Sequence, residues 1–254
     1  MPALPVIMKI CRLRKGDDVR IGVVEGDEIG VFDDDLSDLR ESFRIEEVEL
    51  LPPVSPSKIV CVGRNYSEHA AELGNEVPKA PLLFLKAPSS IINNGEAIVI
   101  PPQSEQVEHE GELAIVIGQR CKNLGDSDDP VSYVFGYTCL NDVTVRDLQR
   151  KDVQFTRAKS FDTFCPVGPF IETDLDTSDL RVTTKVNGIL KQDGRTSQMV
   201  FPVDFLLRYI SNMMTLNAGD VIATGTPAGV STLERGDICE VEIEGIGKLK
   251  NNVV

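Results

Sequence analysis

The alternation of apolar runs and turn residues predicts a chain made mostly of short strands. Residues 8–32 (MKICRLRKGDDVRIGVVEGDEIGVF) hold short apolar runs separated by Gly and Asp, which is typical of two or three antiparallel strands with tight turns. The segment LLPPVSPSK at 50–58 is rich in proline and serine and indicates a linker. We therefore predict a small N-terminal β domain over residues 1–52 and a main domain over residues 53–254.

Short apolar runs continue through the main domain, with turn residues between them. The pair Asn187-Gly188 lies between two alternating runs and is the strongest hairpin signal in the chain. Strands and helices do not alternate regularly, so the pattern indicates a β-rich α+β fold. Strands are predicted at 58–62, 82–86, 97–100, 113–117, 133–139, on both sides of the turn in 183–192, at the start of 221–230, and at 237–245.

A first helix is predicted just after Gly63. Asn65 is its predicted N-cap, with Glu68 three residues later at the spacing of a capping box. Gly74 is predicted to end this helix. Two residues of the helix, His69 and Glu72, are three positions apart and share one face.

Two more helices are predicted further along the chain. Thr144 and Asp147 have the spacing of a second capping box and predict a helix in VRDLQRK. The segment PVDFLLRYISNMMTL at 202–216 places apolar residues at helical spacing behind a proline and is the best helix signal in the chain. Its Met213 and Met214 are predicted to be core residues.

The composition adds a strong negative charge to this picture. Asp and Glu number 40 against 26 Lys and Arg, which gives a net charge of -14. Such a surface disfavours nucleic acids and anionic membranes and is compatible with metal cations. No apolar run approaches the roughly 18 to 20 residues of a membrane helix, and the first charges follow a short apolar piece, the reverse of a secretory signal. We therefore expect a soluble, cytoplasmic protein.

Cysteines, histidines and short motifs exclude several kinds of site. The six cysteines form no CxxC pair, which argues against a disulfide framework or zinc knuckle, and two histidines are too few for a His-rich metal centre. No GxSxG, GxGxxG, Walker or HExxH sequence supports serine hydrolase, dinucleotide, P-loop or zincin chemistry. On local sequence alone, the GTPAG segment at 225–229 is a turn between strands rather than a ligand-binding loop.

Acidic residues beside an apolar strand give the most specific local signal. Glu110 and Glu112 precede the run 113–117 and would project to one face of a strand, where like charges repel unless a cation lies between them. Asp142 follows in a strand-to-helix turn. Three carboxylates without an imidazole suit Mg²⁺ or Mn²⁺, whereas an exposed strand face is the simpler alternative for the glutamate pair.

Other polar residues near these segments have both functional and structural interpretations. His69 and Glu72 have the form of an imidazole oriented by a carboxylate, able to take a proton from water, or of an incidental ion pair on a surface helix. Lys159 lies in RAKSFDTFCPVGP, which is too apolar for a solvated loop, so a buried ammonium there needs an anionic partner from the protein or a substrate. Glu108 and His109 are predicted to lie in a flanking loop.

Seven segments, taken together and in order, resemble the fumarylacetoacetate hydrolase family, in particular the catalytic domain of acylpyruvate hydrolases and oxaloacetate decarboxylases. The resemblance covers residues 58–254, and the N-terminal unit resembles the small β appendage of some bacterial members only weakly. The segments are VCVGRNYSEHAAEL, LLFLK, HEGELAIVIG, GYTCLNDVTVRDLQ, AKSFDTFCPVGP, KVNGILKQDGRTSQMVF and LNAGDVIATGTPAGV.

This resemblance implies a fold, an assembly and a set of site residues. The fold would be a β-sandwich roll or pseudo-barrel with flanking short helices, assembled as a homodimer. The metal would be Mg²⁺ or Mn²⁺, replaceable by Ca²⁺ in a crystal, with Glu110, Glu112 and Asp142 as ligands. The catalytic residues would be His69, Glu72 and Lys159, with the first two on a lid, and the substrate would contact Arg64, Lys86, Arg146, Gln149 and Thr226.

The resemblance also implies a class of reaction on oxo acids. We expect cleavage of a C–C bond in a 2,4-dioxo acid of the acylpyruvate or fumarylpyruvate type, or decarboxylation of oxaloacetate, through a metal-bound enolate. In hydrolysis, His69 held by Glu72 would activate water, and Lys159 would add positive charge beside the enolate. The alternatives are a 2-hydroxyhepta-2,4-diene-1,7-dioate isomerase or 5-oxopent-3-ene-1,2,5-tricarboxylate decarboxylase of aromatic catabolism, and a non-catalytic protein that binds oxo acids. The intact dyad argues against the last of these, because a pure binder needs no general base.

Overall fold

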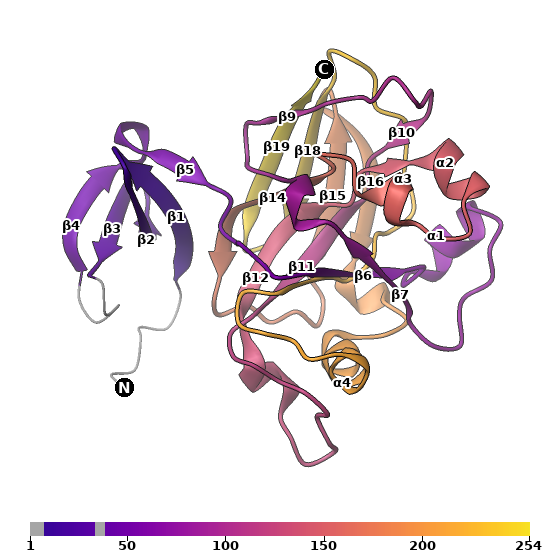
Figure 1. Ribbon diagram of the computed structural model, residues 1–254, viewed down its shortest axis with the longest axis horizontal. Coiled ribbons are helices and arrows are strands. Elements are labelled where there is room, and N and C mark those ends of the chain that lie inside the picture. The colour runs from indigo at the N-terminus through magenta and orange to yellow at the C-terminus, as the bar shows by residue number, and fades with distance from the viewer. Residues whose placement is uncertain (1–7, 34–38) are drawn as a thin grey trace.

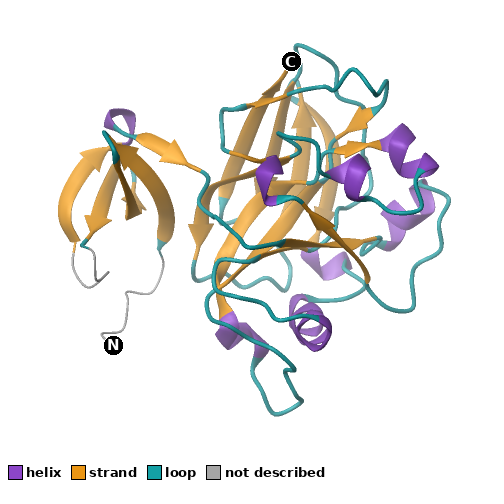
Figure 2. Ribbon diagram, viewed as in Figure 1, coloured by secondary structure: helices purple, strands orange, loops and turns teal. Residues whose placement is uncertain are grey.

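The chain folds mainly into β-strands, with a few short helices at the edges (Figure 1, Figure 2). The computed structural model describes residues 8–33 and 39–254. The predicted β-rich α+β class is confirmed. None of the helices in these two ranges is long and apolar enough to cross a membrane.

An N-terminal meander stands beside the main body (Figure 1) and confirms the antiparallel strands predicted for residues 8–32. Its elements are β1 (Lys9–Lys15), β2 (Asp18–Glu25), β3 (Glu28–Phe32), β4 (Leu39–Arg44), the short helix η1 (Ile45–Glu47) and β5 (Glu49–Leu51). Strand β1 also pairs with β14 (Cys165–Glu172), through Lys9 and Ile10. The meander is therefore hydrogen-bonded to the main sheet as well as joined to it by the chain.

The large sheet has β11 near its centre. Its strands lie in the order β4-β3-β2-β1-β14-β12-β11-β17-β6-β7, and the pair β17 and β6 is parallel. Every residue of β11 is buried, which explains its continuous apolar run after the two glutamates. The strands beyond the meander and β14 are β6 (Ile59–Gly63), β7 (Leu82–Lys86), β11 (Gly111–Ile117), β12 (Val134–Asn141) and β17 (Val221–Ala223), with β8 (Ile91–Ile92) beside β14.

A second sheet packs against the first and encloses the main core. Alternate residues of β11, such as Leu113 and Ile115, share one apolar cluster with Val182 and Val241 of the second sheet. Its strands are β15 (Arg181–Val186), β16 (Ile189–Arg195), β18 (Ile238–Ile243), β19 (Gly247–Val253) and β9 (Ala97–Ile98). A small ladder is formed by β10 (Val107–Glu108) and β13 (Thr144–Val145).

The predicted hairpin in 183–192 is confirmed. Asn187 and Gly188 join β15 to β16 with φ angles of 52° and 77°, a left-handed turn that favours these two residue types. All six cysteines are buried and free, as the absence of CxxC spacing predicts.

The short helices gather mainly on one side of the body. Helices α2 and α3 contact each other, α3 contacts β7, and α1 lies on the same side (Figure 1). The helices are α1 (Ser67–Glu72), α2 (Arg146–Lys151), α3 (Thr156–Lys159), α4 (Val203–Met213), η2 (Pro88–Ser90), η3 (Pro130–Tyr133) and η4 (Thr196–Gln198).

The three predicted helices are confirmed as α1, α2 and α4, but both predicted capping boxes are wrong. Tyr66 and Val145 occupy the N-cap positions of α1 and α2. The Asn65 side chain is buried because it bonds to the backbone of Phe201 and Thr224, far along the chain. Residue Met213, predicted to lie in the core, is 56% exposed because it ends α4 on the outer face.

Candidate active site

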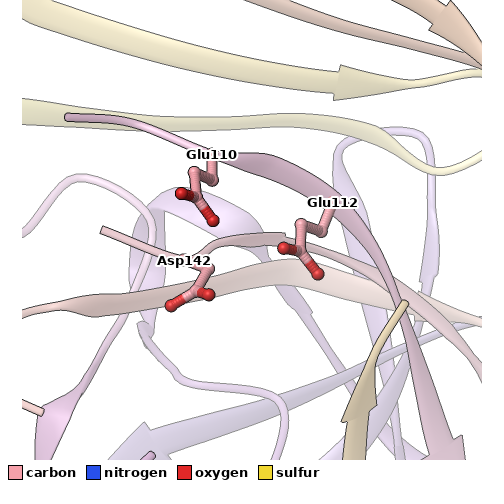
Figure 3. Close-up of side chains that lie close together, drawn as sticks. All are labelled: Glu110, Glu112 and Asp142. Atoms are coloured by element: carbon pink, nitrogen blue, oxygen red, sulfur yellow. The ribbon is translucent and has the colours of Figure 1, made fainter. Parts of the chain in front are cut away.

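Three carboxylates converge at one end of strands β11 and β12 (Figure 3). In this pair of strands Gly111 lies opposite Asn141, and just beyond it the Asp142 N–H donates to the Glu110 carbonyl at 2.8 Å. This register places Asp142 beside Glu110 and Glu112. One oxygen of each carboxylate lies within 4.8 Å of the others, and all three side chains are buried.

Two buried lysines bond to this cluster. The Lys86 Nζ donates to Asp142 Oδ1 at 2.5 Å. The Lys159 Nζ donates to Glu110 Oε2 at 2.7 Å and to Asp142 Oδ2 at 2.6 Å. Burial lowers the pKa of Lys159, but the charges of Asp142 and Glu110 outweigh that effect and raise it, so the ammonium stays protonated.

Arg146 ties the cluster to a further carboxylate. Its guanidinium donates to Glu108 Oε2 at 2.7 Å, to Glu110 Oε1 at 2.5 Å and to Gln149 Oε1 at 2.5 Å. The loop predicted for Glu108 and His109 is wrong for Glu108, which lies in a strand, whereas His109 lies outside the strands as predicted. Glu108 lies in β10 with its carboxylate buried against Arg146, and His109 is fully buried behind the site.

Glu112 differs from the other two carboxylates. Among the described residues, it accepts one hydrogen bond, from the Gly225 N–H at 2.7 Å, and no cationic side chain bonds to it. Burial and the charges of Asp142 and Glu110 raise its pKa well above the ordinary value. Four buried carboxylates thus face three cationic side chains, and Glu112 needs a further positive charge, such as a bound cation, to be stable in its ionised form. Oxygen donors in this number suit a hard divalent ion.

Helix α1 carries His69 and Glu72 to the cavity beside the carboxylates. The His69 Nδ1 lies 3.3 Å from Glu72 Oε2. The same carboxylate accepts from the Gly229 N–H at 3.1 and 3.2 Å, which holds the helix against the glycine-rich turn. Burial lowers the pKa of His69, although the charges of Glu110 and Glu72 oppose this, so the imidazole is neutral near pH 7.

A cavity of about 340 Å³ joins these groups. The predicted residues that line it are Arg64, His69, Glu72, Glu110, Glu112, Asp142, Arg146, Gln149, Lys159 and Thr226. Lys86 does not line it, because its ammonium is bonded to Asp142 and to the Val143 carbonyl behind the carboxylates. This position is that of a residue that orients Asp142 rather than one that contacts a ligand.

The Thr226 hydroxyl is held by partners within the protein. It donates to the Gly111 carbonyl at 2.8 Å and accepts from Gln192 Nε2 at 2.7 Å. The Gln192 Oε1 accepts from the Gly111 N–H at 3.0 Å and lies 3.1 Å from His109 Nδ1. On the far side, His109 Nε2 lies 2.9 Å from Ser231 Oγ. Gln192 therefore connects strand β11 with the glycine-rich turn at 225–229.

The polar residues that the sequence-based prediction misses include Arg150 and Gln192. Arg150 lines the cavity, and its position four residues after Arg146 on α2 is a signal that could have revealed it. Gln192 has no such local signal, because its partners lie in distant parts of the sequence.

The chain matches two sequence families along its length. Residues 58–254 match the family described as "Fumarylacetoacetate (FAA) hydrolase C-terminal". Residues 8–53 match "Rv2993c-like, N-terminal".

Proteins with assigned activities are similar over most of the chain. An oxaloacetate tautomerase of Bacillus subtilis is 39% identical over 242 residues, which cover 89% of this chain and 77% of that protein. The crystal structure of a 2-hydroxyhepta-2,4-diene-1,7-dioate isomerase from Mycobacterium marinum has a TM-score of 0.90 at 41% identity, covering 97% and 98% of the two chains. A fumarylpyruvate hydrolase from Pseudomonas aeruginosa, in complex with Mn²⁺ and pyruvate, has a TM-score of 0.75 at 28% identity, covering 81% and 91%.

Proposed function

The chain belongs to the fumarylacetoacetate hydrolase family, and on that premise we propose that it is a divalent-metal-dependent enzyme that interconverts the keto and enol forms of a small 2-oxo acid of the oxaloacetate type. One observation carries the proposal: the neutral His69, held by Glu72, lines the same cavity as the three convergent carboxylates. Relatives at 39% and 41% identity, a tautomerase and an isomerase, support proton transfer as the reaction.

Glu110, Glu112 and Asp142 would hold the cation. The bound ion would polarise the keto group of a 2-oxo acid and make the protons on the neighbouring carbon more acidic. Mg²⁺ or Mn²⁺ suits the all-oxygen donor set, and the Mn²⁺ bound by the fumarylpyruvate hydrolase supports this choice. The predicted homodimer stays a prediction, which light scattering of the purified protein tests.

His69 would move the proton. Because its Nδ1 faces the Glu72 carboxylate, the proton of the neutral ring belongs on Nδ1, and Nε2 keeps a free lone pair. From keto to enol, that atom would take a proton from the carbon next to the keto group, and the imidazolium would give the proton to the enolate oxygen. In the reverse direction the imidazole would take the proton of the enol hydroxyl and return it to the carbon. Glu72 would stabilise the imidazolium while the proton is held. The contact of Glu72 with the Gly229 N–H would keep α1 in place over the cavity during this transfer.

Lys159 and Gln149 would assist on the substrate side. The Lys159 ammonium is held between Glu110 and Asp142, and its positive charge would stabilise negative charge that develops on the substrate oxygen. The Gln149 Oε1 accepts from Arg146, so its amide N–H groups are oriented away from Arg146 and can donate to an acid group of the substrate.

Hydrolysis of a 2,4-dioxo acid is the second candidate, with decarboxylation of oxaloacetate beside it. The observation that favours hydrolysis is the dyad itself, because a neutral His69 is able to take a proton from a water molecule as well as from carbon. Similarity to the fumarylpyruvate hydrolase is lower, at 28% identity. The two candidates differ in their products: tautomerisation releases no pyruvate, whereas hydrolysis and decarboxylation do.

The proposal is tested by a substrate panel with Mn²⁺-loaded protein. Enol oxaloacetate, acetylpyruvate, fumarylpyruvate and a dienedioate are followed by ultraviolet absorbance, and pyruvate is measured by coupling to lactate dehydrogenase. We expect the enol of oxaloacetate to disappear without matching pyruvate release. In His69→Gln the rate should fall by about 100- to 10,000-fold.

Glu68→Gln is the matched control, because Glu68 precedes His69 on the same helix but does not line the cavity. It should keep the wild-type rate. If His69→Gln also keeps that rate, the proton-transfer role of the dyad is wrong. Stoichiometric pyruvate from any dioxo acid, with no tautomerisation, would establish the second candidate instead.

A further inference from the structure

The cavity has two arginines that its own carboxylates do not neutralise. We propose that Arg150 and Arg64 form a second anion-binding subsite at the solvent side of the cavity, which selects oxo acids with a second carboxylate at the far end. This inference rests on the proposed function, because it assumes that the first acid group and the keto group lie at the metal end.

Arg150 is held in position by a chain of polar contacts. Its Nη1 donates to Gln106 Oε1 at 3.0 Å, and Gln106 Nε2 donates to Glu108 Oε1 at 2.6 Å. Glu108 in turn is held by Arg146. Since Glu108 accepts from the amide nitrogen of Gln106, the amide oxygen is fixed toward Arg150. The guanidinium is thereby preorganised, and its charge has only a neutral partner.

Helix α2 explains why this guanidinium faces the cavity. Arg146, Gln149 and Arg150 stand at positions i, i+3 and i+4, so they share one helix face, and all three line the cavity. Arg146 is buried at the metal end, whereas Arg150 is exposed. The face therefore runs from the carboxylate cluster to the solvent side.

Arg64 enters the same cavity from the end of β6. Among residues 8–33 and 39–254, no carboxylate lies within ion-pair distance of it. Its φ angle is 60°, in the left-handed region that few residues other than glycine adopt. Strain of this kind persists where the surroundings fix a residue for a role, and here it directs a cation to the cavity wall.

The acids of the cavity wall are already engaged. Glu110 and Asp142 are bonded to lysine or arginine, Glu112 remains for the metal, and Glu72 is bonded to His69 and Gly229. In a chain of net charge -14, two arginines without an acidic partner in one cavity indicate that an anion from outside is expected there. Planar guanidinium groups match a carboxylate in geometry as well as in charge.

The test compares two ligands of equal chain length and the same 2-oxo acid head. Binding of 2-oxoglutarate, a dicarboxylate, and of 2-oxovalerate, a monocarboxylate, to Mn²⁺-loaded protein is measured by isothermal titration calorimetry. We expect wild type to prefer 2-oxoglutarate by about 10-fold or more, as for one charge-assisted hydrogen bond. In Arg150→Gln the preference should fall to about 3-fold or less, and 2-oxovalerate should bind unchanged.

Lys151→Gln is the matched control, since it removes an exposed cation of the same helix that does not line the cavity. It should keep the wild-type preference. The subsite would be overturned if Arg150→Gln lost affinity equally for 2-oxoglutarate and 2-oxovalerate, or if the wild type showed no preference between them. Failure of the subsite can be distinguished from failure of the proposed function. If the protein tautomerises oxaloacetate without preferring 2-oxoglutarate, the proposed function holds and the subsite is wrong. If it prefers 2-oxoglutarate but converts no oxo acid, the subsite holds and the proposed function is wrong.

Discussion

The Gly225 N–H donates to Glu112 Oε2 at 2.7 Å, and this backbone contact takes the place that lysine or arginine has at Glu110 and Asp142. The negative charge of Glu112 is therefore the one that a metal ion has to balance. A neutral side chain of the same shape should therefore leave the metal-free protein at least as stable, but should weaken the binding of the metal ion.

Replacing Glu112 by Gln should separate these two effects. Without metal, the variant should be at least as stable as wild type, because a carboxyl group whose ionised form is disfavoured by burial and by two neighbouring negative charges is replaced by a neutral amide. Its affinity for Mn²⁺ should fall by more than about 100-fold, since a direct ligand is lost. Thermal unfolding with and without Mn²⁺, together with calorimetric titration, measures both.

The control for this variant is Glu105→Gln, which neutralises an exposed carboxylate. It should bind Mn²⁺ as wild type does. An unchanged Mn²⁺ affinity in Glu112→Gln would remove Glu112 from the metal site.

The dependence of activity and stability on pH follows from His69. Burial lowers its pKa in the folded protein below the ordinary 6.5, so the ring stays neutral through pH 7 and gains its proton only in more acidic solution. The rate should therefore be flat near neutral pH and fall below pH 6.5. Between the folded pKa and 6.5 the unfolded chain binds more protons, so stability should rise with pH there.

Urea unfolding at a series of pH values measures the stability part of this prediction. In His69→Gln the slope of stability against pH should be smaller just below pH 6.5 than in wild type. The neutral base would be contradicted if the rate already decreased while the pH was being lowered toward 7, and if the stability did not depend on this histidine.

Gln192 should be needed for stability as well as for the shape of the site. Its side chain makes bonds to Gly111, Thr226 and Pro227, and lies near His109. Leucine would leave these buried groups without partners, which should lower the free energy of unfolding by about 2 to 4 kcal/mol. Urea denaturation compares it with Gln103→Leu, at an exposed position, where we expect a change below about 0.5 kcal/mol. Equal stability of the two variants would refute the role of Gln192.

Local patterns predict the strands and the hairpin because their signals lie within a few residues. The buried run of β11 and the pair Asn187-Gly188 both follow from the physics of neighbouring residues. The predicted cap at Asn65 fails because the side chain finds partners at Phe201 and Thr224, which no local rule can anticipate.

The residues of the site also divide into those that the local sequence predicts and those that it does not. The proximity of Glu110, Glu112 and Asp142 could be predicted from their acidic side chains and from the predicted strands beside them, and the structure brings them together. The burial of Glu108 and His109 could not, because it depends on Arg146 and Gln192 from other segments. The position of Lys86 behind Asp142 also depends on how β7 pairs in the sheet.

The most direct measurement of the central claim is a metal titration of the chelator-treated protein, with oxaloacetate tautomerisation followed by ultraviolet absorbance. We predict a rate near background without metal that rises with added Mn²⁺ and saturates at one ion per chain. A full rate in the presence of excess chelator, unaffected by added Mn²⁺, would contradict the metal-dependent account.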